Sequence, residues 1–176
     1  MHLRSKLALS AILALTTGCS FGERSWQCQA ESGRYLPNRW PASPSIHTLS
    51  GRIQFNRGDF GGGEWNPIAH IAFTDSKLPS GRDCFCNGLR AEIFPSEPET
   101  VKFFMIFNGQ ESGIAQSPLG KPITFRLSVD DQGTMTAVVG KTNPVTQTAT
   151  LAHPQRDTVH MSCSGADVSF RNLKME

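Results

Sequence analysis

The stretch ITFRLSVDDQGTMTAVV, residues 123–139, decides the fold class of this 176-residue chain. Its first half alternates between apolar and polar residues, so the apolar side chains fall on one face of an extended strand. The turn DDQG follows, and its Gly133 can adopt the positive φ that a tight hairpin needs. The alternation then resumes in TMTAVV. The stretch therefore predicts an antiparallel β-hairpin with one apolar face.

Short apolar alternations separated by turn residues continue on both sides of this hairpin. The strands that they predict are 46–55, 67–75, 85–94, 100–108, 122–129, 134–139, 145–151, 157–163 and 167–175. Hardly any stretch has a helical period. Many short strands with frequent turns are typical of an antiparallel two-sheet β-sandwich, so we expect an all-β domain over residues 46–176.

Residues 19–45 differ in composition, because ESGRYLPNRWPASPS is rich in proline, serine and glycine. We expect this segment to be in part a tether that follows the N-terminus of the mature chain. Trp26 and Cys28 in WQCQ indicate one strand that is attached to the body of the domain.

The C-terminal stretch VHMSCSGADVSFRNLKME holds two strands with a short turn between them. After Phe170 the apolar phase shifts to Leu173 and Met175, which predicts a β-bulge at Arg171 or Asn172. Together with FRLSVDDQGTMTAVVG, this ending resembles the closing part of the concanavalin A-like jelly rolls, the lectin and glucanase sandwiches. The resemblance implies two curved antiparallel sheets whose concave face often binds sugars. The same fold carries hydrolases, lyases, lectins and structural modules, so it does not settle the function.

The N-terminus has the features of a secretory signal. MHLRSK carries Arg4 and Lys6 and no acid, and LALSAILALTTG after it is apolar but too short to span a membrane. The small residues before Cys19 resemble the lipobox of bacterial lipoproteins, although Thr16 stands where leucine is usual. The resemblance implies that residues 1–18 are a signal peptide, and that Cys19 receives a diacylglycerol and becomes the first residue.

The residue after the lipidated cysteine is Ser20. In the families that use this signal, a serine there goes with sorting to the outer membrane. We therefore expect a lipid-anchored protein of the bacterial outer membrane that faces the periplasm and contacts the membrane through the acyl chains of Cys19. The alternative is a cleaved signal peptide that ends near a cysteine by chance. No later segment has the roughly eighteen uninterrupted apolar residues of a transmembrane helix.

The odd number of cysteines agrees with this interpretation, because acylation of one of the five leaves four for disulfide bonds. These are Cys28, Cys84, Cys86 and Cys163. In CFC, Cys84 and Cys86 project from the same face of a strand, where they rarely satisfy disulfide geometry with each other. We expect each of them to pair with Cys28 or Cys163, with both arrangements open. A zinc site is the competing interpretation, but paired C-x-x-C spacing and an adjacent histidine pair are absent.

The charge of the mature chain excludes some partners. The full chain has 17 basic and 15 acidic residues, and removal of residues 1–18 takes away Arg4 and Lys6, which leaves 15 of each. A neutral chain without blocks of like charge has no electrostatic footprint for nucleic acid. No pair of histidines has metal-binding spacing, so we expect neither a metal nor a cofactor. His47 shares a face with apolar residues, and we expect it to be a hydrogen-bonded interior residue.

The acidic residues do not form a known catalytic pattern. Glycosidases need two carboxylates across the scissile bond, and those of the laminarinase-like group resemble one another in carrying E-x-D-x-x-E on one strand, which is absent here. Glu92, Glu97 and Glu99 flank prolines in AEIFPSEPE, so we expect a solvated loop. No G-x-S-x-G stretch marks a serine nucleophile.

The segment RGDFGGGEWNP, residues 57–67, is the best candidate for ligand binding. Its glycines allow a tight or mobile loop, and Trp65 offers a flat apolar face for a sugar ring. Asp59, Glu64 and Asn66 could hydrogen-bond to hydroxyls beside it. The alternative, which the usual burial of tryptophan favours, is a surface hairpin whose Trp65 folds back over the sandwich edge.

These observations leave three classes of function. The first is a non-catalytic lipoprotein that binds a carbohydrate or a glycan-containing envelope polymer. The second is a structural or adaptor lipoprotein that binds another envelope protein through a sheet edge or face. The third, which lacks paired carboxylates, is a polysaccharide hydrolase or lyase. An exposed aromatic in a concave surface would favour the first, and an exposed apolar patch without a groove the second.

Overall fold

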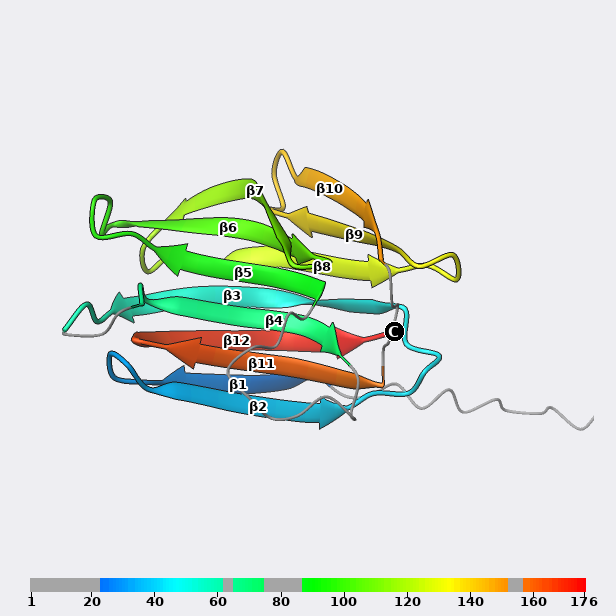
Figure 1. The fold of residues 1–176 in the computed structure, drawn as a ribbon, viewed down its shortest axis with the longest axis horizontal. Coiled ribbons are helices and arrows are strands. Elements are labelled where there is room, and N and C mark those ends of the chain that lie inside the picture. Colours follow the sequence, from blue (N-terminus) through cyan, green and yellow to red (C-terminus); the bar gives the residue numbers. More distant parts are fainter. Residues whose placement is uncertain (1–22, 62–64, 75–86, 152–156) are drawn as a thin grey trace, which may run out of the picture.

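The computed structural model describes residues 23–61, 65–74, 87–151 and 157–176. These residues form two antiparallel sheets of six strands each that pack face to face (Figure 1). In sheet A the strand order is β1-β12-β3-β8-β9-β10, and in sheet B it is β2-β11-β4-β5-β6-β7. The expected all-β, two-sheet sandwich is confirmed.

Sheet A consists of β1 (Arg24–Gln29), β3 (Thr48–Gly58), β8 (Ile123–Val129), β9 (Thr134–Val139), β10 (Val145–Thr150) and β12 (Ala166–Met175). Sheet B consists of β2 (Tyr35–Pro41), β4 (Ile68–Thr74), β5 (Asn87–Ile93), β6 (Thr100–Phe107), β7 (Gln110–Pro118) and β11 (Thr158–Ser164). Figure 1 shows the two sheets in corresponding order, with β10 and β7 at one margin and β1 and β2 at the other. The described part of the chain contains no helix of the length and apolar character needed to cross a membrane.

Every strand that the alternation predicts is present, and two strands occur that it missed. The expected strand at WQCQ is β1. β2 has the sequence YLPNRWP and lies in the segment that we expected to be in part a tether. It was missed because its two prolines interrupt the alternation of a strand. The sequence of β7, QESGIAQSP, is largely polar because β7 lies at a sheet margin. The sandwich therefore includes residues 24–41 as well as the strands after residue 46.

The core lies between the sheets and consists of the side chains that point inward from alternate positions of each strand. In the hairpin of β8 and β9, the buried inward residues are Phe125, Leu127, Val129, Met135, Ala137 and Val139. The turn has the expected geometry, with φ of 79° at Gly133. Asp130 Oδ1 accepts the backbone N–H of Gln132 at 2.9 Å and of Thr134 at 2.7 Å, which closes the turn.

The β-bulge expected in the last strand is also present. The register of β12 against β3 shifts between Arg171 and Lys174, and Asn172 has φ of 53°. Gly51 lies beside the bulge, where a Cβ would come within 2.6 Å of Leu173 Cδ2 and 3.0 Å of the Arg171 carbonyl oxygen. Glycine at this position therefore leaves the space that the bulge occupies.

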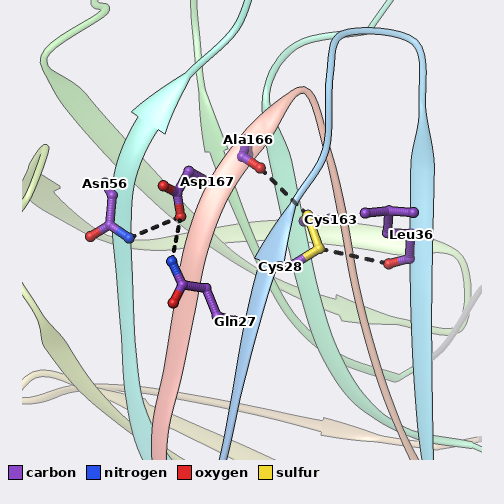
Figure 2. Close-up of a disulfide and its surroundings, with 7 residues drawn as sticks. All are labelled: Gln27, Cys28, Leu36, Asn56, Cys163, Ala166 and Asp167. Carbon is purple, nitrogen blue, oxygen red and sulfur yellow. Dashed lines mark hydrogen bonds between the residues drawn. A yellow bond between two sulfur atoms is a disulfide. The ribbon is translucent and has the colours of Figure 1, made fainter.

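A disulfide joins Cys28 of β1 to Cys163 of β11 and so links the two sheets (Figure 2). The expected pairing of each with Cys84 or Cys86 is wrong. Which cysteines meet depends on which strands the topology places across from each other, and cysteine spacing does not contain that information. Cys84 and Cys86 lie outside the described residues.

Near the disulfide, a side-chain contact ties three strands of sheet A together. Asp167 Oδ1 of β12 accepts hydrogen bonds from Gln27 Nε2 of β1 at 3.3 Å and from Asn56 Nδ2 of β3 at 3.0 Å (Figure 2). The first strand is thus held in sheet A by side chains as well as by its ladder with β12.

Removal of the disulfide is expected to destabilise the domain strongly. The two cysteines are 135 residues apart, and opening a loop of this length in the Cys28→Ala/Cys163→Ala variant should lower the free energy of unfolding by about 4 kcal/mol. Urea unfolding of residues 20–176, which contain all the described strands, measures this loss. Peptide mapping of the parent chain without reduction should recover Cys28 bonded to Cys163. An unchanged unfolding midpoint in the variant would contradict the assignment.

Two glycines of sheet B make a matched pair for a packing test. A Cβ at Gly88 of β5 would collide with the Ile71 carbonyl oxygen and lie 2.5 Å from Ala72 Cβ, whereas a Cβ at Gly113 of β7 would meet only the edge of the Phe104 ring, at 3.8 and 3.9 Å. Gly88→Ala should therefore lower the free energy of unfolding by about 2 kcal/mol or more, and Gly113→Ala should change it by less than about 0.5 kcal/mol. Urea unfolding compares them, and equal effects would refute the expected crowding at Gly88.

Candidate functional site

The outer faces of the two sheets differ in chemistry. Among the described residues, the outward positions of sheet A hold mainly Ser, Thr, Asn, Gln and Arg, and no aromatic ring. The outward positions of β4, β5 and β6 in sheet B instead hold histidine, arginine, glutamate and phenylalanine. Since the inner face of each sheet is used in the core, a binding site on the sandwich has to use an outer face or the loops. The outer face of sheet B is the richer candidate.

Arg90 of β5 is the centre of this face. Its Nη1 and Nη2 each donate to one carboxylate oxygen of Glu111 on β7 at 2.5 Å, in a bidentate pair. Arg90 Nη2 also lies 3.0 Å from Glu92 Oε2 on β5. Asn66 Nδ2, just before β4, donates to Glu92 Oε1 at 2.7 Å. We call these four side chains the Arg90 network, and it runs from the start of β4 across β5 and β6 to β7.

Two phenylalanine rings lie in the same face, each close to a cation. Arg90 Cζ is 5.1 Å from the centre of the Phe104 ring on β6. Phe104 packs edge-on against Phe94, with ring centres 6.3 Å apart and an interplanar angle of 66°. Lys102 Nζ lies 5.2 Å from the centre of the Phe94 ring and 2.8 Å from Glu97 Oε1. The cations and the rings hold one another in position.

A shallow hollow of 390 Å³ lies beside Phe104, lined by residues 102–104 of β6 and 113–116 of β7. Gly113 pairs with Phe104 across the two strands. Because Gly113 has no side chain, one edge of the half-buried ring stays uncovered. Gln116 is exposed at the rim and presents an amide. We call this feature the Phe104 hollow.

Two histidines occupy the neighbouring strands of the same face. His160 of β11 is 1% exposed, and its Nε2 lies 2.8 Å from the Tyr35 hydroxyl. Burial, with a smaller contribution from the charge of Arg39, lowers the pKa of His160 to about 4. Burial also lowers the pKa of His70 on β4 to about 3, with smaller contributions from Arg90 and His160. Both rings are therefore neutral at pH 7.

These two histidines are not fully hydrogen-bonded. Within the described ranges, His70 Nε2 and His160 Nδ1 are buried without a hydrogen-bond partner. Across the same ranges, no three side chains of His, Cys, Asp or Glu are grouped so that they could hold a metal ion. The histidine pair therefore adds buried polar atoms beside the Arg90 network without forming a metal site of its own among these residues.

Asp59, which the sequence suggested as a ligand-binding residue, is hydrogen-bonded to the backbone of neighbouring loops. Its carboxylate accepts the backbone N–H of Gly61 at 2.9 Å and of Ser32 at 3.1 Å, and these hydrogen bonds lower its pKa. The N–H of Asp59 donates to the Gly165 carbonyl oxygen at 2.7 Å. Asp59 thus fastens the loop after β3 to the turn between β1 and β2 and to the turn between β11 and β12.

The other loop candidates lie at the margin of the sheet B face. Asn66 belongs to the Arg90 network, and Trp65 next to it is 43% exposed. Glu64 lies outside the described residues. Glu92, which we expected in a solvated loop, is 8% exposed within β5. That expectation is wrong because β5 continues to Ile93 before the proline-rich turn begins.

Several residues of this face were not found from the sequence. They are Arg90, Phe104, Glu111 and Gln116. A signal for Phe104 does exist, because strict alternation in VKFFMIF puts it in phase with Lys102 and out of phase with the buried Phe103. The contacts among the four residues depend on strand register across β5, β6 and β7, which no local pattern specifies.

Among the described residues, two further hollows, of 370 and 280 Å³, lie at the ends of the sandwich, and neither is lined by phenylalanine, tyrosine or tryptophan. The larger one includes His47, which we expected in the interior. The His47 side chain is instead 43% exposed, with Nδ1 3.1 Å from the Val129 carbonyl oxygen and 3.6 Å from Asp131 Oδ1. The expectation fails because β3 begins at Thr48, so His47 precedes the regular alternation.

No family model matches the chain, and no curated protein is similar to it in sequence. Solved structures match it in fold. A sialidase has a TM-score of 0.61 at 12% identity, over 86% of this chain and 15% of the sialidase chain. Scytalido-glutamic peptidase with a peptide-based transition state analog has a TM-score of 0.53 at 11% identity, over 81% of this chain and 74% of the peptidase.

The exoplasmic/lumenal domain of VIP36, in its Ca²⁺/Man-bound form, has a TM-score of 0.52 at 12% identity, over 88% of this chain and 75% of that domain. Identities this low establish the fold alone. Together with the two six-stranded sheets, they confirm the expected concanavalin A-like β-sandwich. This chain spans only 15% of the length of the sialidase.

The buried histidines predict an acid-sensitive fold. Their folded-state pKa values, about 3 for His70 and about 4 for His160, lie below the ordinary value of 6.5. As the pH falls below about 6.5, the unfolded chain binds protons that the folded chain does not, so the free energy of unfolding should fall by about 2–4 kcal/mol between about pH 7 and pH 5. Urea unfolding across this range measures the slope. The His70→Gln/His160→Gln variant should lose most of it, and an undiminished slope would refute the assignment.

Proposed function

We propose that this chain is a lipoprotein of the outer membrane that is anchored through Cys19, faces the periplasm, and binds a carbohydrate or a glycan-containing envelope polymer without catalysis. The anchor rests on the lipobox-like N-terminus and on the cysteine count. The binding role rests on the outer face of sheet B. The VIP36 domain of similar fold, solved with Ca²⁺ and Man, agrees with a sugar-binding role.

The Phe104 hollow is the observation that carries the binding proposal. A sugar ring has an apolar face of C–H groups and a rim of hydroxyls, so it packs on an aromatic ring and hydrogen-bonds at its edge. At the hollow, Phe104 presents one open edge of such a ring, because Gly113 has no side chain that would cover it. Gln116 at the rim can both donate to and accept from a hydroxyl.

The Arg90 network holds the polar part of this site in place before a ligand arrives. Arg90 fixes both oxygens of Glu111, which keep further lone pairs for hydroxyl donors. Phe104 is fixed between Arg90 and Phe94. Side chains that are already ordered lose little rotamer entropy on binding, which favours affinity for a weakly held ligand such as a sugar.

Trp65 extends the same surface at its margin. It is next to Asn66, which is bonded to Glu92 of the network, and it is 43% exposed. A polymer that packs on Phe104 could therefore make a second aromatic contact at Trp65. Asp59 has a structural role in this proposal, because both of its carboxylate oxygens accept backbone N–H groups.

The same geometry favours binding over hydrolysis. A glycosidase needs two carboxylates that face each other across the bond to be cleaved. Glu92 and Glu111 both pair with the guanidinium of Arg90, which occupies the space between them. Neither carboxylate is placed to protonate a leaving group while the other attacks.

The proposal is tested by the affinity of residues 20–176 for a panel of oligosaccharides and purified peptidoglycan. Phe104→Ala should weaken binding by about tenfold or more, because it removes the stacking ring, and Trp65→Ala should weaken binding to polymers more than to short oligosaccharides. Gly113→Val keeps the ring but fills the hollow, so it should also block binding. Phe60→Ala is the control, since Phe60 is 38% exposed outside this site.

Loss of affinity in Phe104→Ala and Gly113→Val, with unchanged unfolding midpoints, would support the site. If binding persists in both variants, the ligand binds somewhere other than the Phe104 hollow. A parent domain that binds no glycan would refute the carbohydrate proposal.

The adaptor role is the second candidate, and one observation favours it. β10 has the sequence VTQTAT, pairs with β9, and lies at the margin of sheet A. Exposed edge strands are usually protected by charge, proline or a bulge, and β10 carries neither charge nor proline. An extended segment of another envelope protein could therefore add to sheet A there.

A further inference from the structure

A cluster of cations lies on the outer face of sheet A. Arg171 of β12 and Arg52 of β3 are direct partners in the ladder. In the next row, Ser50 of β3 is flanked by Lys174 of β12 and Arg126 of β8. All four cationic residues are exposed. We call Arg52, Arg126 and Arg171 the arginine patch.

The arginine patch is not balanced by acids. Like charges directly opposite each other on neighbouring strands repel, so such a pair is unfavourable unless an anion neutralises it. Lys174 is paired with Glu23 at 3.0 Å. In the part of the chain that the structure describes, none of the three arginines of the patch forms an ion pair.

Besides Glu23, the described acids of β12 and its C-terminal end lie toward the two ends of the strand. Asp167, toward one end of β12, accepts hydrogen bonds from Gln27 and Asn56. Glu176, at the other end, has its backbone N–H bonded to the Thr48 carbonyl oxygen, and its charge helps to raise the pKa of Lys174. The centre of the face between these ends is therefore cationic.

The position of the patch relative to the N-terminus indicates its partner. The ion pair between Glu23 and Lys174 puts the start of the described chain at the margin of the patch. Cys19 precedes Glu23 by four residues, which span at most about 14 Å when extended. A lipid on Cys19 would therefore hold the margin of the patch within about 14 Å of the membrane surface, so that the patch can come into contact with the headgroups.

We propose that the arginine patch docks on the phosphates of anionic lipid headgroups beside the Cys19 anchor. Guanidinium groups match phosphate oxygens in a bidentate geometry, and one phosphate between Arg52 and Arg171 would relieve their repulsion. The proposal uses the anchor of the proposed function but not the glycan site. With sheet A on the membrane, the outer face of sheet B points away from it, where an envelope polymer can reach the Phe104 hollow.

The test is co-sedimentation of residues 20–176, which lack the acylated cysteine, with vesicles of phosphatidylcholine alone or mixed with phosphatidylglycerol. The domain should bind only the anionic vesicles, and binding should fall as salt is raised. Each of Arg52→Gln, Arg126→Gln and Arg171→Gln should weaken binding about fivefold, and Arg52→Gln/Arg171→Gln about 25-fold, from the usual contribution of one cation near an anionic surface.

Arg34→Gln is the matched control. Arg34 lies in the turn between β1 and β2, paired with Glu31, and its substitution removes the same charge outside the patch. If Arg34→Gln weakens vesicle binding as much as Arg171→Gln does, the proposal is overturned, because binding would then depend on the net charge alone. Equal binding to both kinds of vesicle, or none to either, would overturn it as well. Glycan affinity is measured separately on the same variants. A failure of the lipid proposal therefore does not affect the glycan proposal at the Phe104 hollow, and a failure of the glycan proposal does not affect the lipid proposal.

Discussion

The apolar layer between the two sheets is the constraint from which the rest of this structure follows. Alternation sends one side chain in two from every strand into this layer, and residues such as Leu49, Ile71, Leu127 and Met161 are completely buried there. The layer uses the inner face of each sheet, so binding chemistry is left to the outer faces and the loops. The two outer faces differ in composition, with cations and small polar residues on sheet A and aromatic rings with ion pairs on sheet B.

The fold could be predicted from the sequence where the local pattern carries the information. The hairpin at residues 123–139 and the bulge near Asn172 are set by alternation and by residues that tolerate positive φ, so both appeared as expected. β2 was missed because prolines interrupt its pattern at a sheet margin, where the lost ladder hydrogen bonds cost little. The disulfide partners were wrong because the meeting of β1 with β11 is a property of the whole topology.

The candidate site could be predicted only at its margin. The loop around Trp65 stood out because its glycines allow a tight turn and its tryptophan offers a flat apolar face, and Asn66 does join the Arg90 network. The centre of the site is made by Arg90, Phe104 and Glu111, which are up to 21 residues apart in sequence and meet through the register of three strands. Phe104 also sits in an apolar run, where an outward ring looks like a core residue. Residue types alone cannot separate these two cases.

The pairing of β1 with β12 sets the order in which the domain can mature. Among the described strands of sheet A, β1 pairs with β12 alone. The hydrogen bond from Gln27 to Asp167 and the disulfide from Cys28 to Cys163 attach β1 to the same distant part of the sequence. In a chain that emerges N-terminus first, β1 therefore has no partner in sheet A until β12 has appeared. Contacts between distant parts of the sequence dominate the closure of the sandwich, and folding of this kind is slow. During that interval, WQCQ is an unpaired strand whose Cys28 has not yet met Cys163, and an exposed strand of this kind is prone to wrong pairing and aggregation.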